Sequence, residues 1–156
     1  MRKITISVIG GNKCSNEVEQ TAHKIGKIIA KVGAILVCGG LEGIMKAVCK
    51  GAKAENGLTI GIITSYDKSD ANEYCDIVIP TGLNDARNVL VVQSGDIIVA
   101  LPGEYGTLSE IAFALRFKKP VVSLGSWDIP GVIQVKTVEE AEKKIVELIK
   151  LYMEIS

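Results

Sequence analysis

Short, almost uninterrupted apolar runs recur along the chain and alternate with longer segments whose apolar residues have helical spacing. The runs are ITISVI, AILVC, LTIGIIT, DIVIP, DIIVAL and PVVSLG, with VIQVK as a last short candidate. Strands that are apolar on both faces are typical of parallel sheets covered by helices on both sides. We therefore predict an α/β fold with a three-layer, Rossmann-like, doubly wound and mainly parallel sheet, whose strands all end at one edge.

The segments between these runs predict helices with recognisable ends. A helix from about Asn16 to Val32 is expected to begin at Ser15 as its N-cap. The segment IMKAVCKGAKAEN predicts a second helix, closed by Gly57. Two further helices are predicted in ARNVLVVQS and GTLSEIAFALRFK. The last helix, VEEAEKKIVELIKLYMEI, follows Thr137 as N-cap, with Glu140 placed for a capping box.

Length and charge limit the size of the fold and its partners. A chain of 156 residues predicts one Rossmann-like domain over residues 1–156. It is 47% hydrophobic with a formal net charge of zero, which argues against nucleic acids and anionic membrane surfaces as partners. No apolar run approaches the ~20 residues of a membrane span, and the first run is too short for a signal peptide. We expect a cytoplasmic protein.

The cysteines give no sign of a metal centre. Cys14, Cys38, Cys49 and Cys75 include no C-x-x-C pair, and the single His23 cannot complete a zinc set. We expect reduced thiols and no bound metal. A thiol that contacts a ligand remains open for Cys14, in the first loop, and for Cys38, at a strand end.

The fold class itself predicts where a ligand binds. In open α/β sheets, ligands occupy the crevice beyond the carboxyl ends of the strands. Four turns lie there: GGNKCS, which begins with Gly10 and Gly11, then CGGLEGIM, TGLNDARN and PGEYGTLSE. Three of them carry a glycine pair or Gly-x-x-Gly spacing. No Walker motif and no dinucleotide fingerprint is present.

The turn CGGLEGIM combines glycines with the start of a helix. Gly39, Gly40 and Gly43 permit left-handed backbone or close approach of a ligand, and Met45 lies in the first turn of the helix. Backbone amides at a helix start form an anion pocket. The alternative is a tight turn that only packs the helix against the strand.

The turn PGEYGTLSE repeats this arrangement. Gly103 and Gly106 shape the turn, and Thr107 is expected to act as N-cap and to offer its hydroxyl to a phosphate oxygen. Glu110 then has two interpretations. It is either a capping-box partner of Thr107 or a carboxylate that faces the ligand.

The segment NDARN supplies a positive charge. Arg87 is the only arginine near these turns, and its fork suits phosphate recognition. A salt bridge with Asp85 or a neighbouring residue is the alternative. Asn88 follows directly and is a further candidate contact.

The segments GGLEGIMKAV, PTGLNDARN and PGEYGTLSEIAFAL, in this order, resemble the LONELY GUY (LOG)/lysine decarboxylase-like family, and more closely its molybdenum-cofactor-carrier branch. LOG enzymes cleave the N-glycosidic bond of nucleoside 5′-monophosphates. The resemblance implies that Gly103, Gly106 and Thr107 hold a phosphate. It also matches Glu110 and Arg87 to the family's catalytic glutamate and arginine.

Two departures from the LOG pattern affect the predicted function. Glu104 replaces the second glycine of the family's P-G-G turn, and Asn88 stands where LOG enzymes have lysine. Both favour binding of a phosphorylated, nucleotide-like or pterin-like molecule, with molybdenum cofactor or a nucleotide as cargo and no required cofactor. The alternatives are a nucleoside 5′-monophosphate phosphoribohydrolase that uses Glu110 and Arg87, or a Rossmann-like domain without a ligand.

Two helices predict self-association. RNVLVVQS and IAFALRF are apolar most of the way round, and such helices need cover on more than the side that faces the sheet. We therefore expect a homodimer or a higher homo-oligomer.

Overall fold

A seven-stranded, entirely parallel sheet organises the computed structural model, which describes residues 2–155. The strand order is β4-β3-β2-β1-β5-β6-β7. The strands are β1 (Thr5–Ile9), β2 (Ile35–Cys38), β3 (Thr59–Ile63), β4 (Ile77–Pro80), β5 (Ile97–Ala100), β6 (Val121–Leu124) and β7 (Ile133–Val135). The predicted parallel α/β fold is confirmed.

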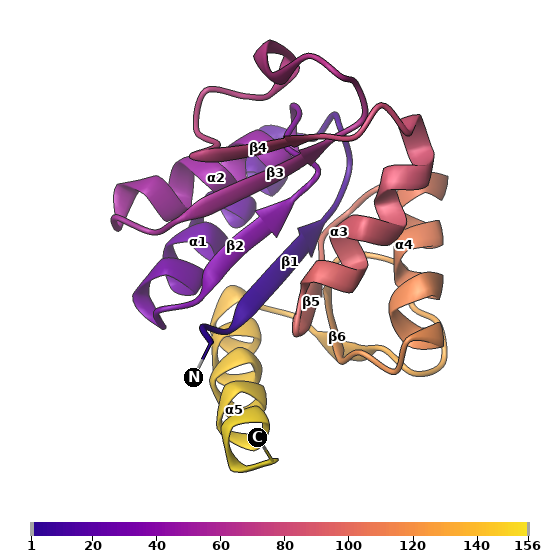
Figure 1. Cartoon of the computed structure of the whole chain (residues 1–156). Helices are drawn as coiled ribbons and strands as arrows, with labels where there is room; N and C mark the ends of the chain where they lie inside the picture. Colours follow the sequence, from indigo (N-terminus) through magenta and orange to yellow (C-terminus); the bar gives the residue numbers. More distant parts are fainter. Residues whose placement is uncertain (1, 156) are drawn as a thin grey trace.

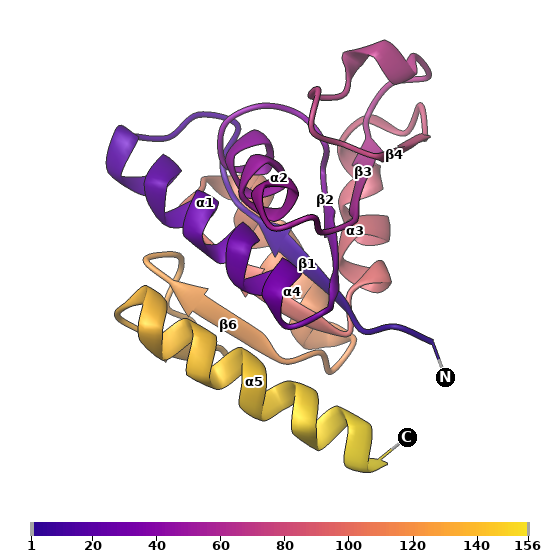
Figure 2. The same cartoon turned by 90° about the vertical axis from the view of Figure 1, so that its left-hand side faces the viewer.

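Helices cover both faces of the sheet, which gives three layers (Figures 1 and 2). One core packs beneath α1 (Asn16–Lys31), α2 (Ile44–Ala54) and α5 (Val138–Ile155). The other packs beneath α3 (Asn88–Ser94) and α4 (Tyr105–Arg116). Short 3-10 turns, η1 (Lys68–Asp70) and η2 (Asn84–Arg87), lie on either side of β4. Within residues 2–155, no helix combines the length and apolar character that crossing a bilayer requires.

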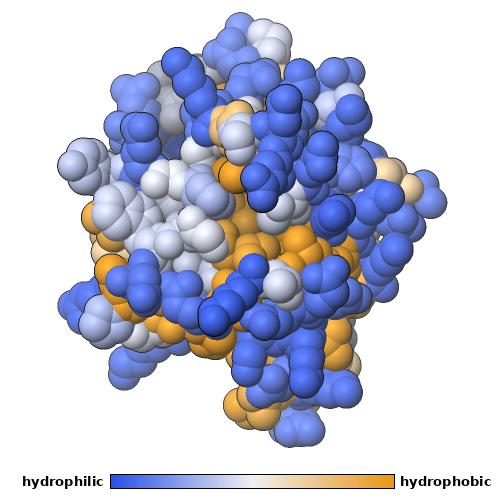
Figure 3. Space-filling model, turned by 180° about the vertical axis from the view of Figure 1, so that it is seen from behind, coloured by the Kyte–Doolittle hydropathy of each residue, from blue (hydrophilic) through white to orange (hydrophobic). Residues whose placement is uncertain are grey.

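The strand burial explains why the apolar runs are continuous. All residues of β5 and β6 are buried, because helices pack on both faces of these strands. The edge strand β4 differs, since Ile77 and Ile79 remain 44% and 43% exposed. Leu90 of α3 and Phe113 of α4 are similarly exposed, at 40% and 39%. Seen from behind Figure 1, the surface also carries a central apolar area bordered by hydrophilic side chains (Figure 3).

Most helix ends follow their sequence signals. The Ser15 hydroxyl accepts a hydrogen bond from the Val18 amide at 3.2 Å, which confirms it as the N-cap of α1. At α5 the Thr137 hydroxyl accepts from the Glu140 amide at 3.1 Å, and the Glu140 carboxylate accepts from the Lys136 amide at 2.7 Å.

Two helix ends differ from prediction. The left-handed residue after α2 is Asn56, with φ of 58°, rather than Gly57. Asparagine tolerates this conformation because its short polar side chain bonds locally. The helix α4 begins at Tyr105 with Glu104 as N-cap, so the prediction of Thr107 as N-cap is wrong. Thr107 lies inside the first turn, where its side chain is 3% exposed.

The strand order creates a switch point beside β1. The chain runs outward from β1 through β2 and β3 to β4, then returns to pair β5 with the other side of β1. The connections after β1 and β5 therefore leave toward opposite faces of the sheet, into α1 and α4 (Figure 1). A crevice is expected where such connections diverge.

Candidate ligand-binding site

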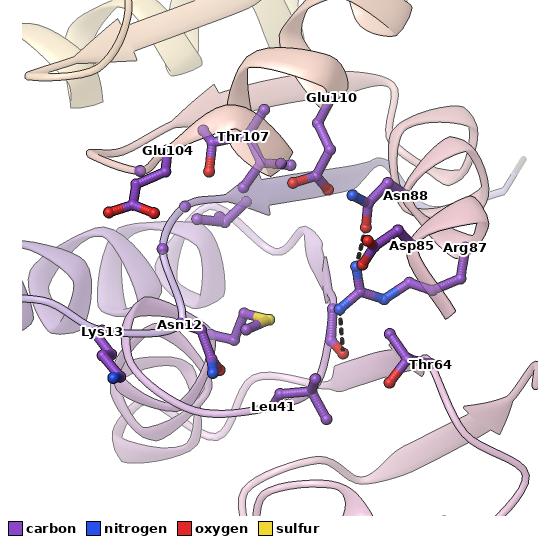
Figure 4. Close-up of a pocket in the computed structure, with 18 residues that line it drawn as sticks. Asn12, Lys13, Leu41, Thr64, Asp85, Arg87, Asn88, Glu104, Thr107 and Glu110 are labelled. Atoms are coloured by element: carbon purple, nitrogen blue, oxygen red, sulfur yellow. Dashed lines mark hydrogen bonds between the residues drawn. The ribbon is translucent and has the colours of Figure 1, made fainter. Parts of the chain in front are cut away.

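A cavity of about 530 Å³ opens at this switch point, beyond the carboxyl ends of the central strands (Figure 4). Its volume lies within the range of small-molecule sites. The lining combines glycine-rich turns, a few apolar side chains and charged groups of both signs: Val8, Ile9, Gly10, Gly11, Asn12, Lys13, Gly39, Leu41, Met45, Thr64, Asp85, Arg87, Asn88, Gly103, Glu104, Gly106, Thr107 and Glu110.

The turn after β1 connects the other two glycine-rich turns. The Gly11 amide donates to the Pro102 carbonyl at 2.9 Å, and the Gly11 carbonyl accepts from the Ile44 amide at 3.1 Å. The Asn12 side chain also accepts from the Glu42 amide at 3.3 Å. The backbone of Gly11 is therefore hydrogen-bonded both to the start of α2 and to the turn before α4, and the turns before both helices contribute to the same cavity.

The start of α4 is the better anion site of the two. The amides of Tyr105, Gly106 and Thr107 make no hydrogen bond within residues 2–155, and the first helical bond runs from Leu108 to Glu104. At α2, by contrast, the first amide is already used by Gly11. Free amides and the helix dipole favour an anion at the start of α4.

The packing around Gly103 leaves no room for a side chain. A Cβ there would overlap the Thr107 hydroxyl and would lie 3.0 Å from the Gly11 amide nitrogen. The absence of a side chain lets the turn after β5 close onto the turn after β1, and Thr107 presents its hydroxyl at the same place. Glycine at residue 103 therefore shapes the anion site directly.

Glu110 lies one turn further along α4, on the same side as Thr107. It is 7% exposed and forms no ion pair within residues 2–155. In Figure 4 its carboxyl group points into the cavity, toward Arg87 and Asn88. Burial raises its pKa from 4.5 to about 8, despite the opposing charge of Arg87. The capping-box interpretation is wrong, because Glu104 rather than Thr107 is the N-cap.

Arg87 is buried at the end of η2 and faces Glu110 across the cavity (Figure 4). Its guanidinium donates to the Asn88 side-chain oxygen and, at 3.4 Å, to the Gly39 carbonyl. Its Nε atom is buried and has no hydrogen-bond partner among residues 2–155. Burial lowers the pKa of Arg87, while the charges of Glu110, Cys38 and Asp85 act in the opposite direction. No ion pair joins it to Asp85 among the described residues, so the predicted alternative of a salt bridge is wrong.

Asn88 is oriented by its neighbour. Its side-chain oxygen accepts from Arg87, which leaves its amide nitrogen directed toward α4. That nitrogen lies 4.0 Å from the position that a Cβ on Gly106 would occupy. Asn88 therefore offers a neutral hydrogen-bond donor between Arg87 and Glu110.

The structure brings most of the predicted site residues to one cavity. Ten line it: Gly10, Gly11, Gly39, Met45, Arg87, Asn88, Gly103, Gly106, Thr107 and Glu110. Gly40 and Gly43 are not among the lining residues. Their φ angles are 73° and 62°, and they pack against Gly61 and the Asn12 backbone, so they shape the turn.

Several lining residues were not predicted as contacts. Lys13 and Asn12 follow the first glycine pair, and the position of that pair after a strand was the available signal. Leu41 and Thr64 carried no recognisable pattern, because each is a single residue in a connection. The sequence predicts Asp85 only as a salt-bridge partner and Glu104 only as a departure from a family motif.

Comparisons with known proteins agree with this architecture. Residues 3–152 match the model of the SLOG cluster4 family. The molybdenum cofactor binding protein of Rippkaea orientalis superposes with a TM-score of 0.90 at 35% identity, over 96% of this chain and 99% of that one. The molybdenum cofactor carrier protein of Chlamydomonas reinhardtii gives 0.86 at 34% identity, over the same shares.

A more distant relative is an enzyme by name. The cytokinin riboside 5′-monophosphate phosphoribohydrolase of Mycobacterium tuberculosis is 30% identical over 120 residues, which cover 71% of this chain and 64% of that protein. The LOG-like, molybdenum-cofactor-carrier-like resemblance of the sequence is confirmed, and the chain belongs to the SLOG cluster4 family.

Proposed function

We propose that the cavity binds a phosphorylated, nucleotide-like or pterin-like small molecule and that the protein acts as its carrier. The observation that carries this proposal is the start of α4, where three backbone amides without a hydrogen-bond partner in residues 2–155 lie near the Thr107 hydroxyl, beside the Gly103 turn. A phosphate group would accept hydrogen bonds from these donors. The carriers of molybdenum cofactor with the same fold support this proposal.

The rest of the cavity suits a flat ring. Val8, Ile9, Leu41 and Met45 provide apolar surface between the two glycine-rich turns. The polar edge of such a ring would meet Glu110 and Asn88. Molybdenum cofactor and a nucleotide both combine a phosphate with a ring of this kind, and either is a suitable cargo.

The cations near the phosphate site are few. Lys13 is exposed at the cavity and is free to approach a bound phosphate, whereas Arg87 is held by Asn88 and Gly39. Glu104 lies at the start of α4 and adds a negative charge there. This balance favours reversible binding over tight capture, as a carrier requires.

Hydrolysis of a nucleoside 5′-monophosphate is the second candidate, and Glu110 supports it. A buried carboxyl group that faces a cavity without a partner is a candidate acid–base group. It would stabilise the oxocarbenium-like transition state or activate water. The distant phosphoribohydrolase relative also supports this reaction.

The two functions predict different results in one experiment. AMP is incubated with wild type and Glu110→Gln while release of free adenine is measured, and AMP affinity is measured by calorimetry. A carrier binds AMP or co-purifies with a phosphorylated ring compound under native mass spectrometry, and it releases no base. An enzyme releases adenine, and Glu110→Gln lowers that rate by orders of magnitude.

Arg87→Ala tests the other side of the cavity, with Arg116→Ala at the end of α4 as the matched control. We expect Arg87→Ala to lose most AMP affinity and Arg116→Ala to retain it. The reason for the expected loss is that the Arg87 guanidinium lines the cavity, and unchanged binding in Arg87→Ala would show that it does not contact the ligand. We further propose that the protein acts in the cytoplasm as a homo-oligomer, in keeping with its four free cysteines and its exposed apolar side chains.

A further inference from the structure

Three of the four cysteines gather behind the wall of the cavity. Cys38 ends β2, Cys49 lies in α2, and Cys75 lies in the loop before β4. The sulfur atoms of Cys38 and Cys49 are 3.4 Å apart, and both residues are fully buried. Cys75 is half-buried and is therefore the member of the group that small solutes can reach.

Backbone contacts at Gly40 join Cys38 to Cys75. The Gly40 amide donates to the Cys38 sulfur at 3.3 Å, and the Gly40 carbonyl accepts from the Cys75 thiol at 3.9 Å. Cys75 also lies close to Gly61 on the neighbouring strand, where a Cβ would be 2.7 Å from its sulfur. The Cys38 and Cys75 sulfurs thus both contact Gly40, and Gly61, which lies beside the Cys75 sulfur, pairs in register with Cys38.

The same loop is tied to the turn that lines the cavity. The Asn72 amide donates to the Gly40 carbonyl at 2.9 Å, and the Asn72 side chain donates to the Leu41 carbonyl at 2.9 Å. Leu41 and Gly39 line the cavity, and the Gly39 carbonyl accepts from Arg87. The loop that carries Cys75 is thus hydrogen-bonded to Gly40 and Leu41, so we expect oxidation of the thiols to alter the adjacent cavity wall.

The three thiols differ in their readiness to ionise, since the pKa of Cys75 is lowered and the pKa values of Cys38 and Cys49 are raised. Hydrogen bonds from Cys38 and Cys49 hold the pKa of Cys75 well below its usual range, although burial and Asp76 oppose this. The pKa of Cys49 is raised, because its own hydrogen bonds to Cys38 and Cys75 and its burial favour the protonated thiol. The accessible thiol, Cys75, is thus the one that ionises more readily, and the thiolate is the nucleophilic form.

We propose that Cys75 is an oxidation site for hydroperoxides and that Cys38 resolves it by forming a Cys38–Cys75 disulfide. The Cys75 thiolate attacks one peroxide oxygen, the O–O bond breaks, and the leaving oxygen takes a proton as water or an alcohol. The resulting sulfenic acid on Cys75 is then attacked by the Cys38 sulfur, which gives up its proton as water leaves. The two sulfurs lose two electrons in total, and the peroxide gains them.

A metal ion is a poorer occupant of this group. Among residues 2–155, no set of three or more histidine, cysteine, aspartate or glutamate side chains is arranged to hold one. Thiol oxidation needs only two sulfurs within reach of each other and one of them accessible.

Cys14, also half-buried but placed in the turn after β1, serves as the matched control. Burial and the charge of Glu19 raise its pKa.

The test uses the full chain, reduced and then treated with hydrogen peroxide. Peptide mapping should show a Cys38–Cys75 disulfide in wild type and in Cys14→Ser, and no disulfide in Cys75→Ser. In Cys38→Ala, dimedone should trap a sulfenic acid on Cys75. Because a variant of the buried Cys38 is at risk of misfolding, the rate of alkylation in wild type provides a second measurement. At pH 6, iodoacetamide should modify Cys75 roughly ten times faster than Cys14 or more.

Three outcomes would overturn the proposal: equal alkylation of Cys75 and Cys14, a Cys38–Cys49 disulfide that still forms in Cys75→Ser, or conversion of Cys75 to sulfinic acid without a disulfide.

The effect of oxidation on the cavity wall is measured separately, by hydrogen exchange of the peptide that contains Gly39, Gly40 and Leu41. We expect faster exchange there after oxidation in wild type and no change in Cys75→Ser, and unchanged exchange in oxidised wild type contradicts the coupling. None of these measurements depends on the proposed ligand.

Discussion

Glu110 and Arg87 face the same cavity, yet no ion pair joins them among the described residues. Arg87 is instead held by Asn88 and the Gly39 carbonyl, while the Glu110 carboxyl group forms no ion pair within residues 2–155. A structural ion pair would have closed the space between them. The separation leaves both groups able to act on a third molecule.

The raised pKa of Glu110 predicts how stability depends on pH. The pKa rises from 4.5 in the unfolded chain to about 8 in the folded protein, so the folded state holds this proton more tightly. Folding stability contributed by this group is therefore greatest below pH 4.5, falls as the pH rises toward 8, and stays low above it. We expect Glu110→Gln to be more stable than wild type at pH 9, on the order of a few kcal/mol.

Urea unfolding at pH 4.5, 7 and 9 measures this difference. The gap between Glu110→Gln and wild type should be small at pH 4.5 and should widen with pH. A gap that is constant across the series would mean that Glu110 has no raised pKa in the folded state.

Thr107 is predicted to act through its hydroxyl alone. Thr107→Val keeps the shape of this buried side chain but removes the donor and acceptor at the start of α4. We expect AMP affinity to fall by about 1 kcal/mol, or roughly fivefold. Ser109→Ala is the control, because its hydroxyl donates to the Gly106 carbonyl at 2.7 Å and does not line the cavity. Equal losses in both variants would argue against a phosphate at Thr107.

Gly103 and Gly106 predict opposite effects on stability. Gly103→Ala introduces overlap with Thr107 and close contact with the Gly11 amide, so we expect destabilisation by roughly 1–3 kcal/mol together with lost binding. Gly106→Ala lies in α4 with only the Asn88 side chain near the new Cβ, at 4.0 Å. A gain of up to about 1 kcal/mol is expected there from helix propensity.

Gly106→Ala should nevertheless weaken AMP binding, since its methyl group enters the lining of the cavity. Thermal unfolding and calorimetry separate the two effects. If Gly106→Ala binds AMP as wild type does, the ligand does not approach this part of α4.

The sequence predicts a homo-oligomer from its apolar helices, and we expect its interface to include the exposed apolar residues of β4 and α3. Ile79 and Leu90 are 43% and 40% exposed, and we expect the double variant Ile79→Asp/Leu90→Asp to dissociate the assembly. Leu151→Asp on α5 is the control, because Leu151 is 48% exposed and lies on the opposite face of the sheet. Sedimentation velocity at micromolar concentration gives the answer. A monomeric wild type would contradict the prediction itself.

The sheet could be predicted from the sequence because strands that are buried on both faces appear as continuous apolar runs. The runs that became β5 and β6 have no polar face to confuse with helix periodicity. The same logic located the cavity, since parallel strands must end at one edge. The order of the strands, and hence the place of the switch beside β1, could not be read from local patterns.

The details of the turns were harder to predict. Thr107 follows a glycine and precedes a helical segment by its spacing, so it had the signature of an N-cap. Packing against Gly103 placed it inside the helix instead. Gly40 and Gly39 are adjacent and identical in sequence, but only Gly39 lines the cavity. A glycine that permits left-handed backbone cannot be distinguished by sequence from one that admits a ligand.

The lining residues all fall between Val8 and Glu110, so β6, β7 and α5 contribute none of them. The polypeptide after α4 completes the sheet and covers one of its faces, while the chemistry of recognition is encoded earlier in the chain. A reporter group attached near the loop at Gly131, between β6 and β7, would therefore sit on the scaffold and not on the recognition surface. The residues that line the cavity and the C-terminal segment available for modification are therefore separate parts of the sequence.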